Sequence, residues 1–450
     1  MQQFELTKQF IEPFIEHIDN KENEELIPIL NRLFAADIAE IFDSLNLDQA
    51  VYITNLIDTQ KKVDVLAELE EDVRGRFFKG YSSNEIALQF IQHMDSDDAV
   101  DILSVLPTKE SEEIISYIPD KKQSLQLTML LRYPDDSAGG LMAKELIKVN
   151  IEWTVAQCTE EIRKQAEEVS QVYTVYVVDE NDTLLGLVSL KKIILSRANT
   201  KISTIYDNNV IYAHVTESGE SIAQTIKKYD LVALPIVDSL TRLIGRITVD
   251  DVLEFVTEEA DKDYQMLSGI SENVEAKDKV WVLSRSRLPW LLIGMIGGLG
   301  SSVVIGGFEE AIKLNVNLAF FMPLVMAMGG NAGVQSSSII VQGLANNTIG
   351  SAGVLGKLGK EFMVALLNGL ICSLVVLLYG LVFNIEQDIT LVVAISLLSI
   401  ILLASIMGTL VPLVLEKFEV DPALATGPFI TTTNDLLGLF LYFLIGNSLL

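Results

Sequence analysis

The last apolar stretch of the chain, ATGPFITTTNDLLGLFLYFLIGNSLL (Ala425–Leu450), decides how the molecule must be built. It is longer than the roughly 20 residues that a helix needs to cross the hydrocarbon core of a bilayer. Asp435 lies near its middle, and the stretch contains no Lys or Arg. A carboxylate at that depth costs about 2.5–3.5 kcal/mol on insertion scales, so it should face water, a partner or a cation. The sequence therefore predicts a membrane helix with a functional polar face.

The charge of the chain is distributed unevenly. The 450 residues include 33 Lys and Arg and 61 Asp and Glu. Only four of the basic and nine of the acidic residues follow Arg287, so the first 287 residues carry a net charge of −23. Such a charge disfavours nucleic acid and anionic lipid surfaces as partners and favours cations. We therefore expect an acidic soluble part joined to a membrane part.

Five apolar stretches after Arg287 approach or exceed the length of a membrane span. The connection into the first stretch is rich in Lys and Arg, and Lys357 and Lys360 lie between the second and third. Because Lys and Arg are enriched in cytoplasmic loops, the N-terminus is predicted to be cytoplasmic and the C-terminus extracytoplasmic, in the inner or plasma membrane of a cell. The predicted spans are Leu288–Gly306, Leu318–Leu344, Phe362–Phe383, Ile389–Leu415 and Ala425–Leu449.

Small and polar residues are concentrated in the first two spans. GMIGG (Gly294–Gly298) is a Gly-x-x-x-Gly match, which predicts close approach of a neighbouring helix. In FFMPLVMAMGGNAGVQSSS (Phe320–Ser338), Pro323 and three glycines predict a loosened helix with free backbone carbonyls, beside protein or a water-filled cavity. Asn331 and Gln335 add side-chain oxygens one helical turn apart. Together with Asp435 they indicate the wall of a pore.

The segment before the last span adds a second carboxylate. Asp421 precedes Asp435 by 14 residues, about 21 Å along a continuous helix. The four residues before Asp435, Thr431 to Asn434, are predicted to line the approach to it. The set then offers only oxygen ligands, which favours Mg²⁺ or Ca²⁺ over softer metals. Mg²⁺ keeps several waters and touches one or two carboxylates, and a single Asp435 per subunit fits a hydrated ion. An alternative is a protonated, structural Asp435 bonded to Thr or Asn.

The soluble part contains two internal repeats. ADIAEIFDSLNLDQAVYITNLI (Ala36–Ile57) resembles DDAVDILSVLPTKESEEIISYI (Asp97–Ile118) at a spacing of 61 residues, and each copy predicts a helix, a turn and a helix, as in a solenoid. YVVDENDTLLGLVSLKKII (Tyr176–Ile194) matches PIVDSLTRLIGRITVDDVL (Pro235–Leu253) at a spacing of 59. Each copy of this second repeat predicts two strands followed by a helix.

The second repeat resembles tandem cystathionine-β-synthase-type (CBS) modules, regulatory folds that often bind adenine nucleotides. Thr248 and Asp251 match a Thr-x-x-Asp pattern that contacts a ribose in that family, whereas the first copy has Ser189 and Lys192 there. The resemblance therefore implies an adenine nucleotide at one of the two positions.

A strongly acidic helix is predicted over Val249–Gly269, between the second module and the membrane. Like charges recur along it at i,i+4, and each such pair disfavours an isolated helix by about 0.2–0.5 kcal/mol. Repulsion that accumulates in this way is relieved by cations, although a solvated linker would have the same composition.

The whole chain resembles the MgtE family of magnesium channels and transporters. The match rests on the order of YPDDSAGGLM (Tyr133–Met142), the paired CBS copies, GGNAGVQ (Gly329–Gln335) and DPALATGPFITTTND (Asp421–Asp435). The resemblance implies a homodimer in the lipid bilayer that is not an enzyme. It also implies passive import of Mg²⁺ down its electrochemical gradient, with the pore closed by cytosolic Mg²⁺.

The resemblance also assigns residues. In the pore it points to Asp435 and Asp421, with Asn331 from the polar second span. The cytosolic sensor residues are Asp251, Glu254, Glu259 and Asp263 on the acidic helix, Glu220 and Asp230 in the second CBS module, and Asp95 and Asp98 in the helical domain. Lys262 stands where the family has an acid.

The predicted fold is therefore a multidomain membrane protein with an α-helical N-terminal solenoid, an α/β tandem CBS pair, a connecting helix and an all-α domain of five spans. Two other functions are open: a proton- or sodium-coupled cation carrier with Asp435 as its protonation site, and an intramembrane metalloenzyme. The sequence disfavours the enzyme, since it offers neither a His-x-x-x-His set nor an acidic dyad on one span. The predicted boundaries are 1–131 for the helical domain, 132–200 and 201–257 for the CBS modules, 258–284 for the connecting helix and 285–450 for the membrane domain.

Overall fold

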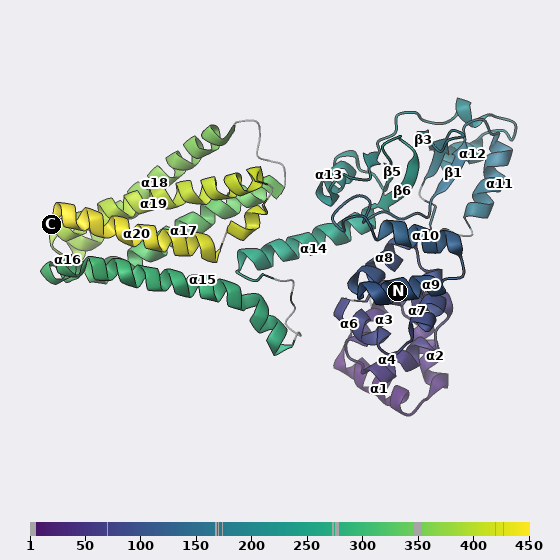
Figure 1. The fold of residues 1–450 in the computed structure, drawn as a ribbon, viewed down its shortest axis with the longest axis horizontal. Coiled ribbons are helices and arrows are strands. Elements are labelled where there is room, and N and C mark those ends of the chain that lie inside the picture. Colours follow the sequence, from purple (N-terminus) through teal and green to yellow (C-terminus); the bar gives the residue numbers. More distant parts are fainter. Residues whose placement is uncertain are drawn as a thin grey trace. The chain divides into compact units, whose positions relative to one another are not determined.

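The computed structural model divides the chain into two compact units, Met1–Val256 and Thr257–Leu450. The predicted fold class is confirmed: a helical N-terminal part, two α/β modules, a connecting helix and five membrane-length helices follow one another along the chain (Figure 1). The structure describes residues 6–69, 71–166, 169, 171–172, 174–271, 274, 279–345, 353–418, 420–425 and 427–450.

Up to Leu131, the described residues of the first unit form short helices joined by turns. The predicted helix–turn–helix repeat is confirmed, because α3 and α4 correspond to α8 and α9. Buried aliphatic and aromatic side chains of these helices form one hydrophobic core, which continues into the second α/β module. The helices are α1 (Lys8–Asp19), α2 (Asn23–Arg32), α3 (Ala35–Phe42), α4 (Leu47–Thr54), α5 (Thr59–Ala67), α6 (Glu71–Phe78), α7 (Ser83–Gln89), η1 (Ile91–His93), α8 (Ser96–Val105), α9 (Thr108–Tyr117) and α10 (Lys121–Leu130).

The two α/β modules have the same sheet. Their strand orders are β1-β2-β3 and β4-β5-β6, with the first pair parallel and the second antiparallel in each. Both antiparallel pairs shift register at the end of the middle strand, where an Asp side chain accepts backbone N–H groups in the turn. The elements are β1 (Ile147–Asn150), α11 (Val155–Gln165), β2 (Val175–Val178), β3 (Leu184–Val188), α12 (Leu190–Leu195), η2 (Ile202–Thr204), β4 (Ala213–His214), α13 (Gly219–Tyr229), β5 (Ala233–Val237) and β6 (Leu243–Thr248).

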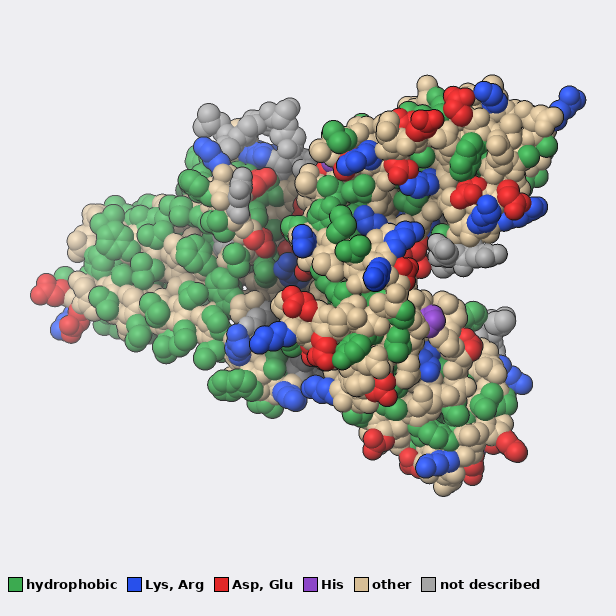
Figure 2. Space-filling model, turned by 45° about the vertical axis from the view of Figure 1, so that its right-hand side comes forward, with side chains coloured by type: hydrophobic (Ala, Val, Ile, Leu, Met, Phe, Trp, Pro, Cys, Tyr) green, Lys and Arg blue, Asp and Glu red, His purple; other side chains and the backbone are tan. Residues whose placement is uncertain are grey.

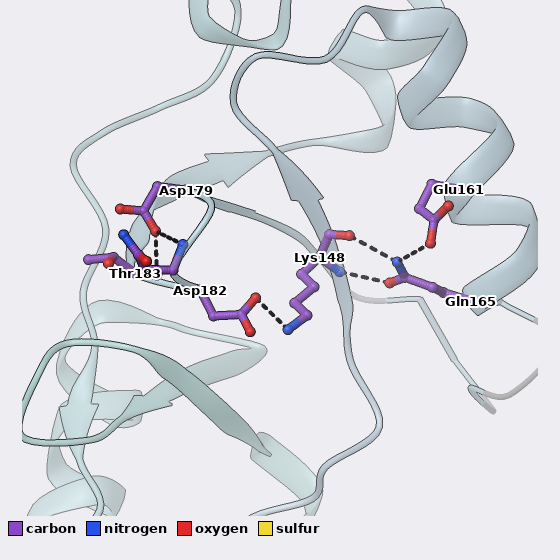
Figure 3. A network of polar contacts seen from close by, with 7 residues as sticks. Lys148, Glu161, Gln165, Asp179, Asp182 and Thr183 are labelled. Carbon is purple, nitrogen blue, oxygen red and sulfur yellow. Dashed lines mark hydrogen bonds and ion pairs between the residues drawn. The ribbon is translucent and has the colours of Figure 1, made fainter.

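Polar contacts bind the first module together at its surface (Figure 3). Lys148 Nζ donates to Asp182 in the β2–β3 turn over 2.6 Å, and the same turn is held by Asp179, which accepts the backbone N–H of Thr183. The side chain of Gln165 bonds to both backbone groups of Lys148 and to Glu161, which attaches α11 to β1. These contacts attach α11 and the β2–β3 turn to β1, around the separate apolar core of this module.

The motif YPDDSAGGLM enters the pair through the second module. Gly139 N donates to Val215 O over 2.9 Å, and Gly219 N donates to Asp136 O over 2.6 Å. A Cβ on Gly139 would lie 2.5 Å from the ring of Tyr133, so only glycine allows this close packing. The motif therefore joins the helical domain to the second module before the chain builds the first sheet.

The acidic connecting helix α14 (Val249–Leu267) follows β6 without a break. It begins inside the second module and ends well before residue 284, and the next helix starts at Val280. The predicted segment 258–284 thus combines the second half of α14 with the chain that leads to the membrane helices.

Five helices of the second unit are long and apolar enough to cross a membrane, as predicted. Hydrophobic side chains cover much of the visible surface of this unit (Figure 2). Charged side chains are scattered instead over the visible surface of the first unit. The helices are α15 (Val280–Gly307), α16 (Glu309–Leu314), α17 (Asn317–Ala345), α18 (Gly353–Phe383), α19 (Gln387–Lys417), η3 (Pro422–Ala425) and α20 (Pro428–Leu449), of which α16 and η3 are short.

Two expectations about glycine in these helices are wrong. The second span is one continuous helix, α17, so its glycines do not loosen it. Among the described residues of a single copy, nothing lies within 4 Å of a Cβ on Gly294 or Gly298, so the contact within this copy does not run through them; a Cβ on Gly297 would instead lie 1.7 Å from Thr432 Cγ2. A Gly-x-x-x-Gly match identifies a smooth strip on a helix, whereas the partner helix here packs on the neighbouring strip.

Candidate functional site

Asp435 is the eighth residue of α20 and lies on its third turn, directly beside the glycine-rich segment of α17. A Cβ on Gly330 would lie 3.6 Å from Asp435 Oδ1 and 3.1 Å from Thr431 Cγ2. Thr431 and Asp435 are four residues apart and therefore share one face of α20. The absence of a side chain at Gly330 thus leaves room for the carboxylate between the two helices.

The other polar residues before Asp435 point elsewhere. Thr432 packs on α15 at Gly297, and Asn434 is 3% exposed and lies against Gly333 of α17. The expectation that all four residues from 431 to 434 line one approach is wrong, because successive residues of a helix are turned by about 100°. Within the described residues, Asn434 Nδ2 has no hydrogen-bond partner.

Asn331 and Gln335 lie on α17 one turn apart and are both exposed in a single copy of the chain. Their neighbours Gly330 and Gly333 are buried against α20. Two exposed amides in the middle of a membrane helix are costly beside lipid tails. This face of α17 therefore needs water or protein in front of it.

Asp421 lies outside the last span. Its Oδ1 accepts the N–H of Ala423 over 2.8 Å at the start of η3, and α20 begins only at Pro428. Gly427 between them has a φ of 59°, in the left-handed region that favours glycine. The expected separation of about 21 Å along one helix is therefore wrong, since only the part after Gly427 is regular helix leading to Asp435.

A second group of acids gathers in the first unit, where α8 meets the second module. Asp95, Asp97 and Asp98 lie at the first turn of α8, and Asp251 lies in the first turn of α14. Burial raises the pKa of Asp98 to about 7, and the neighbouring carboxylates of Asp95, Asp101 and Asp251 add to this shift, which Arg74 partly offsets. Residues 95, 98 and 251, which were predicted from sequence as sensors, are thus placed in one electrostatic cluster.

Two members of this cluster were not predicted. The pKa of Asp97 is raised well above its ordinary value by burial, and then by Asp98, Asp251 and Glu145. Glu145 accepts hydrogen bonds from Ser96 N over 3.1 Å and from Ser96 Oγ over 2.8 Å. Asp97 stands beside Asp98 in the quoted repeat, but nothing in the local pattern connects Glu145 to residues 49 positions earlier.

The remaining predicted sensor residues are dispersed. Glu220 lies in the first turn of α13, whereas Asp230 is the residue after its last turn and has a φ of 51°. Their separation of ten positions corresponds to about 15 Å of helix, too far for one ion within one copy. Glu254, Glu259 and Asp263 follow one another along α14, each four or five residues after the one before.

The proposed ribose contacts have local partners. Thr248 N donates to Asp251 Oδ2 over 2.7 Å, which caps the start of α14. Thr248 is 5% exposed, and its Oγ1 has no hydrogen-bond partner within the described residues. The structure therefore places Asp251 both at the acid cluster and beside an unpaired hydroxyl.

These carboxylates do not form a preassembled chelate. In the part of the chain that the structure describes, no three His, Cys, Asp or Glu side chains are close enough to hold a metal ion. A cation that keeps most of its water and touches one or two carboxylates fits this arrangement, and that is how Mg²⁺ binds in many proteins.

Comparison with known proteins gives matches along nearly the whole chain. A family model described as MgtE, a divalent cation transporter, matches residues 322–445, and a model of the MgtE intracellular N domain matches residues 33–136. The CBS domain model matches twice, at residues 138–199 and 202–258.

Two curated relatives cover most of the chain. The magnesium transporter MgtE of Bacillus subtilis (strain 168) is 30% identical over 420 residues, which is 93% of either chain. The magnesium transporter MgtE of Thermus thermophilus is 29% identical over 440 residues, 97% of either chain.

Two solved structures each resemble about half of this chain. The soluble part of a magnesium transporter superposes with a TM-score of 0.51 and 27% identity, covering 56% of this chain and 99% of its own. The cytosolic domain of the Mg²⁺ channel MgtE in complex with ATP has a TM-score of 0.51 and 26% identity, covering 54% and 99%.

Proposed function

This chain belongs to the MgtE family of divalent cation transporters, and we propose that it imports Mg²⁺ through a pore lined by Asp435. The strongest support is the position of the Asp435 carboxylate beside Gly330, in a membrane-length helix. The other polar side chains of this segment are hydroxyls and amides, whose oxygens are also ligands that Mg²⁺ accepts. A hydrated Mg²⁺ needs one charged contact and space for its water.

The driving force needs no chemical step. Moving two charges inward across about 100 mV of membrane potential releases roughly 4.6 kcal/mol, so import proceeds without ATP hydrolysis or a catalytic centre. Residues Asp435 and Asn331 would contact the hydrated ion, and Asp421 would attract it near the cytoplasmic mouth.

Asp435→Ala is the direct test. Uptake of Mg²⁺ by a magnesium-starved host should fall by about tenfold or more, since bonds to a charged group contribute roughly 1.5–3 kcal/mol. Asp388→Asn, an exposed acid at the start of α19, is the matched control and should transport normally. Full-rate uptake by Asp435→Ala would refute the proposal. Flux of the unaltered protein that follows a proton or sodium gradient would favour a coupled carrier.

We further propose that cytosolic Mg²⁺ closes the pore. The first 287 residues carry a net charge of −23, and α8 places several acids against Asp251. Mg²⁺ bridging these surfaces and the acids Glu254, Glu259, Asp263, Glu220 and Asp230 would favour a contracted state, whereas its loss would release the repulsion. Ligands shift such an equilibrium only by binding one state better, and several sites that act together sharpen the response.

A homodimer would complete the pore. Asn331 and Gln335 are exposed on α17 in a single copy, and a second copy across a two-fold axis would cover this polar face and bring two Asp435 carboxylates toward one another. In this arrangement the N-terminus would be cytoplasmic and the C-terminus extracytoplasmic, as the distribution of Lys and Arg indicates.

An adenine nucleotide would bind the CBS pair near Thr248 and Asp251. The buried, unpaired Oγ1 of Thr248 is a polar atom that a ribose hydroxyl would satisfy. The cytosolic domain of a related channel, 26% identical, has been solved in complex with ATP. Because Asp251 also belongs to the acid cluster, nucleotide and Mg²⁺ would influence each other there.

A further inference from the structure

Lys262 is the one basic residue on the acidic helix α14, which otherwise carries seven carboxylates between Val249 and Leu267. Its Nζ forms an ion pair with Glu259 Oε1 over 3.0 Å, one turn earlier on the same helix. The side chain of Lys262 is 46% exposed and that of Glu259 is 37% exposed, so water and other ions reach the pair.

The surroundings of Lys262 extend beyond its own helix. The hydrogen bond and charge of Glu259 raise the pKa of Lys262, and the carboxylates of Asp421 and Asp263 add to this shift. Asp421 belongs to the segment that leads into α20, the helix that carries Asp435. One ammonium group thus lies in the field of acids from both α14 and the entrance of the last span.

The end of α14 and the beginning of α20 also pack directly on each other. A Cβ on Gly427 would lie 2.5 Å from Leu267 O, and a Cβ on Gly269 would lie 2.7 Å from Pro428 Cγ. The two helices therefore meet at glycines, within the second unit. Lys262 lies on α14 five residues before Leu267, and Asp421 lies six residues before Gly427, so both charges flank this contact along the chain.

We propose that Lys262 is a positioning residue. Its tethered positive charge neutralises part of the acidic region between α14 and Asp421, which we call the seam. Without Lys262, a divalent cation would be required there. A lysine ammonium offers three donors on a flexible stem, so it can contact carboxylates on two elements. It carries one charge where Mg²⁺ carries two, but unlike Mg²⁺ it is always present. This seam is therefore partly closed even without Mg²⁺, and fewer regulatory ions are needed to shut the pore.

This inference rests on the proposed gating by Mg²⁺, and the experiment separates the two. Single-channel recording from the full-length protein in excised membrane patches gives the ratio of closed to open time against Mg²⁺ on the cytoplasmic face. In chelator, Lys262→Gln should lower that ratio about two- to fivefold, as expected for loss of an exposed ion pair. Its Mg²⁺ response should also become steeper, since an added ion must replace the missing charge.

Two further variants sharpen the result. Lys262→Glu should lower the closed-to-open ratio further and steepen the response more, whereas Lys262→Arg should behave like the unaltered protein. A lysine that only packs its stem would tolerate Lys262→Gln and would not be sensitive to the sign of charge. Lys279→Gln removes an exposed lysine at the start of α15 and serves as the control.

The recordings distinguish the role of Lys262 from the gating proposal. If the unaltered channel responds to Mg²⁺ but Lys262→Gln leaves the ratio in chelator and the steepness unchanged, the role of Lys262 is wrong and the gating proposal stands. If the unaltered channel does not respond to cytosolic Mg²⁺, both are wrong.

Discussion

The two CBS modules share one fold but differ in charge at the same position. After β3 the first module continues with Lys191 and Lys192, whereas after β6 the second continues with Asp250 and Asp251. Strand order, direction and register shift are the same in both. Apolar residues at matching positions therefore determine the fold, and the charged residues at the start of the following helix distinguish the two modules.

The helices that follow β3 and β6 also differ in length. The helix after β6 is extended into α14 and places Asp251 against the acids of α8, while α12 in the first module ends at Leu195. Under the proposed regulation by Mg²⁺, only the second module would gain from a divalent cation at this position. The first module packs instead around a separate apolar core of its own, with the ion pair between Lys148 and Asp182 at its surface.

The largest expected effect breaks the shared framework. A Cβ on Gly186 would lie 2.1 Å from the backbone oxygen of Asp207, whereas on Gly245 it would lie 2.7 Å from Sδ of Met142 and 2.9 Å from the backbone oxygen of Ala143. Gly186→Ala should therefore cost about 3 kcal/mol or more, at the upper end of overpacking, and Gly245→Ala less. The full-length variants are heated, and the temperature at which residues 138–258 lose their resistance to a protease gives the stability of each variant. A larger loss for Gly245→Ala would contradict the comparison.

A medium effect is expected where the modules differ in charge. Asp251→Asn keeps an acceptor for Thr248 N but removes a charge from the cluster with Asp97 and Asp98. In the absence of Mg²⁺, cleavage by an added protease between the helical domain and the modules should slow about fivefold, for roughly 1 kcal/mol of relieved repulsion. Lys192→Gln at the equivalent position of the first module should leave the cleavage rate unchanged. Equal effects of the two variants would show that the modules do not differ in this respect.

The smallest expected effect is a dependence on pH. The pKa of Asp98 is raised to about 7 in the folded state and is near 4 in an unfolded chain, so the folded state binds the additional proton between these values. Stability of the α8 surface should therefore increase as the pH falls from 7 toward 4, and be lowest above pH 7. Protease protection in chelator at pH 8 and pH 6 tests this. Asp98→Asn should reduce the difference, and an unchanged difference would assign it to other groups.

Repeats and spans could be predicted because they depend on local periodicity. The spacing of 59 residues between the CBS copies and the five apolar stretches reflects residues that face a core or a bilayer. The acids at Asp95, Asp98 and Asp251 could be named from their family positions, and the structure places them in one cluster. Their role as a Mg²⁺ sensor is still a prediction.

Partners across the fold could not be predicted. The pattern identified small residues in α15, but not that Gly297 rather than Gly294 meets Thr432. Composition suggested that the glycines of α17 weaken the helix, whereas tight neighbours at Gly330 and Gly333 use the same glycines for packing. Which face of a helix meets which neighbour depends on the shapes of both partners, and that information is not local.

The contact between Gly427 and Leu267 has a mechanical consequence. No side chain lies between the two backbones, so the joint has no soft layer that could absorb a displacement. A displacement of the end of α14 would therefore be transmitted to the start of α20 almost without loss. Any residue larger than glycine at position 427 would act as a permanent spacer at this contact.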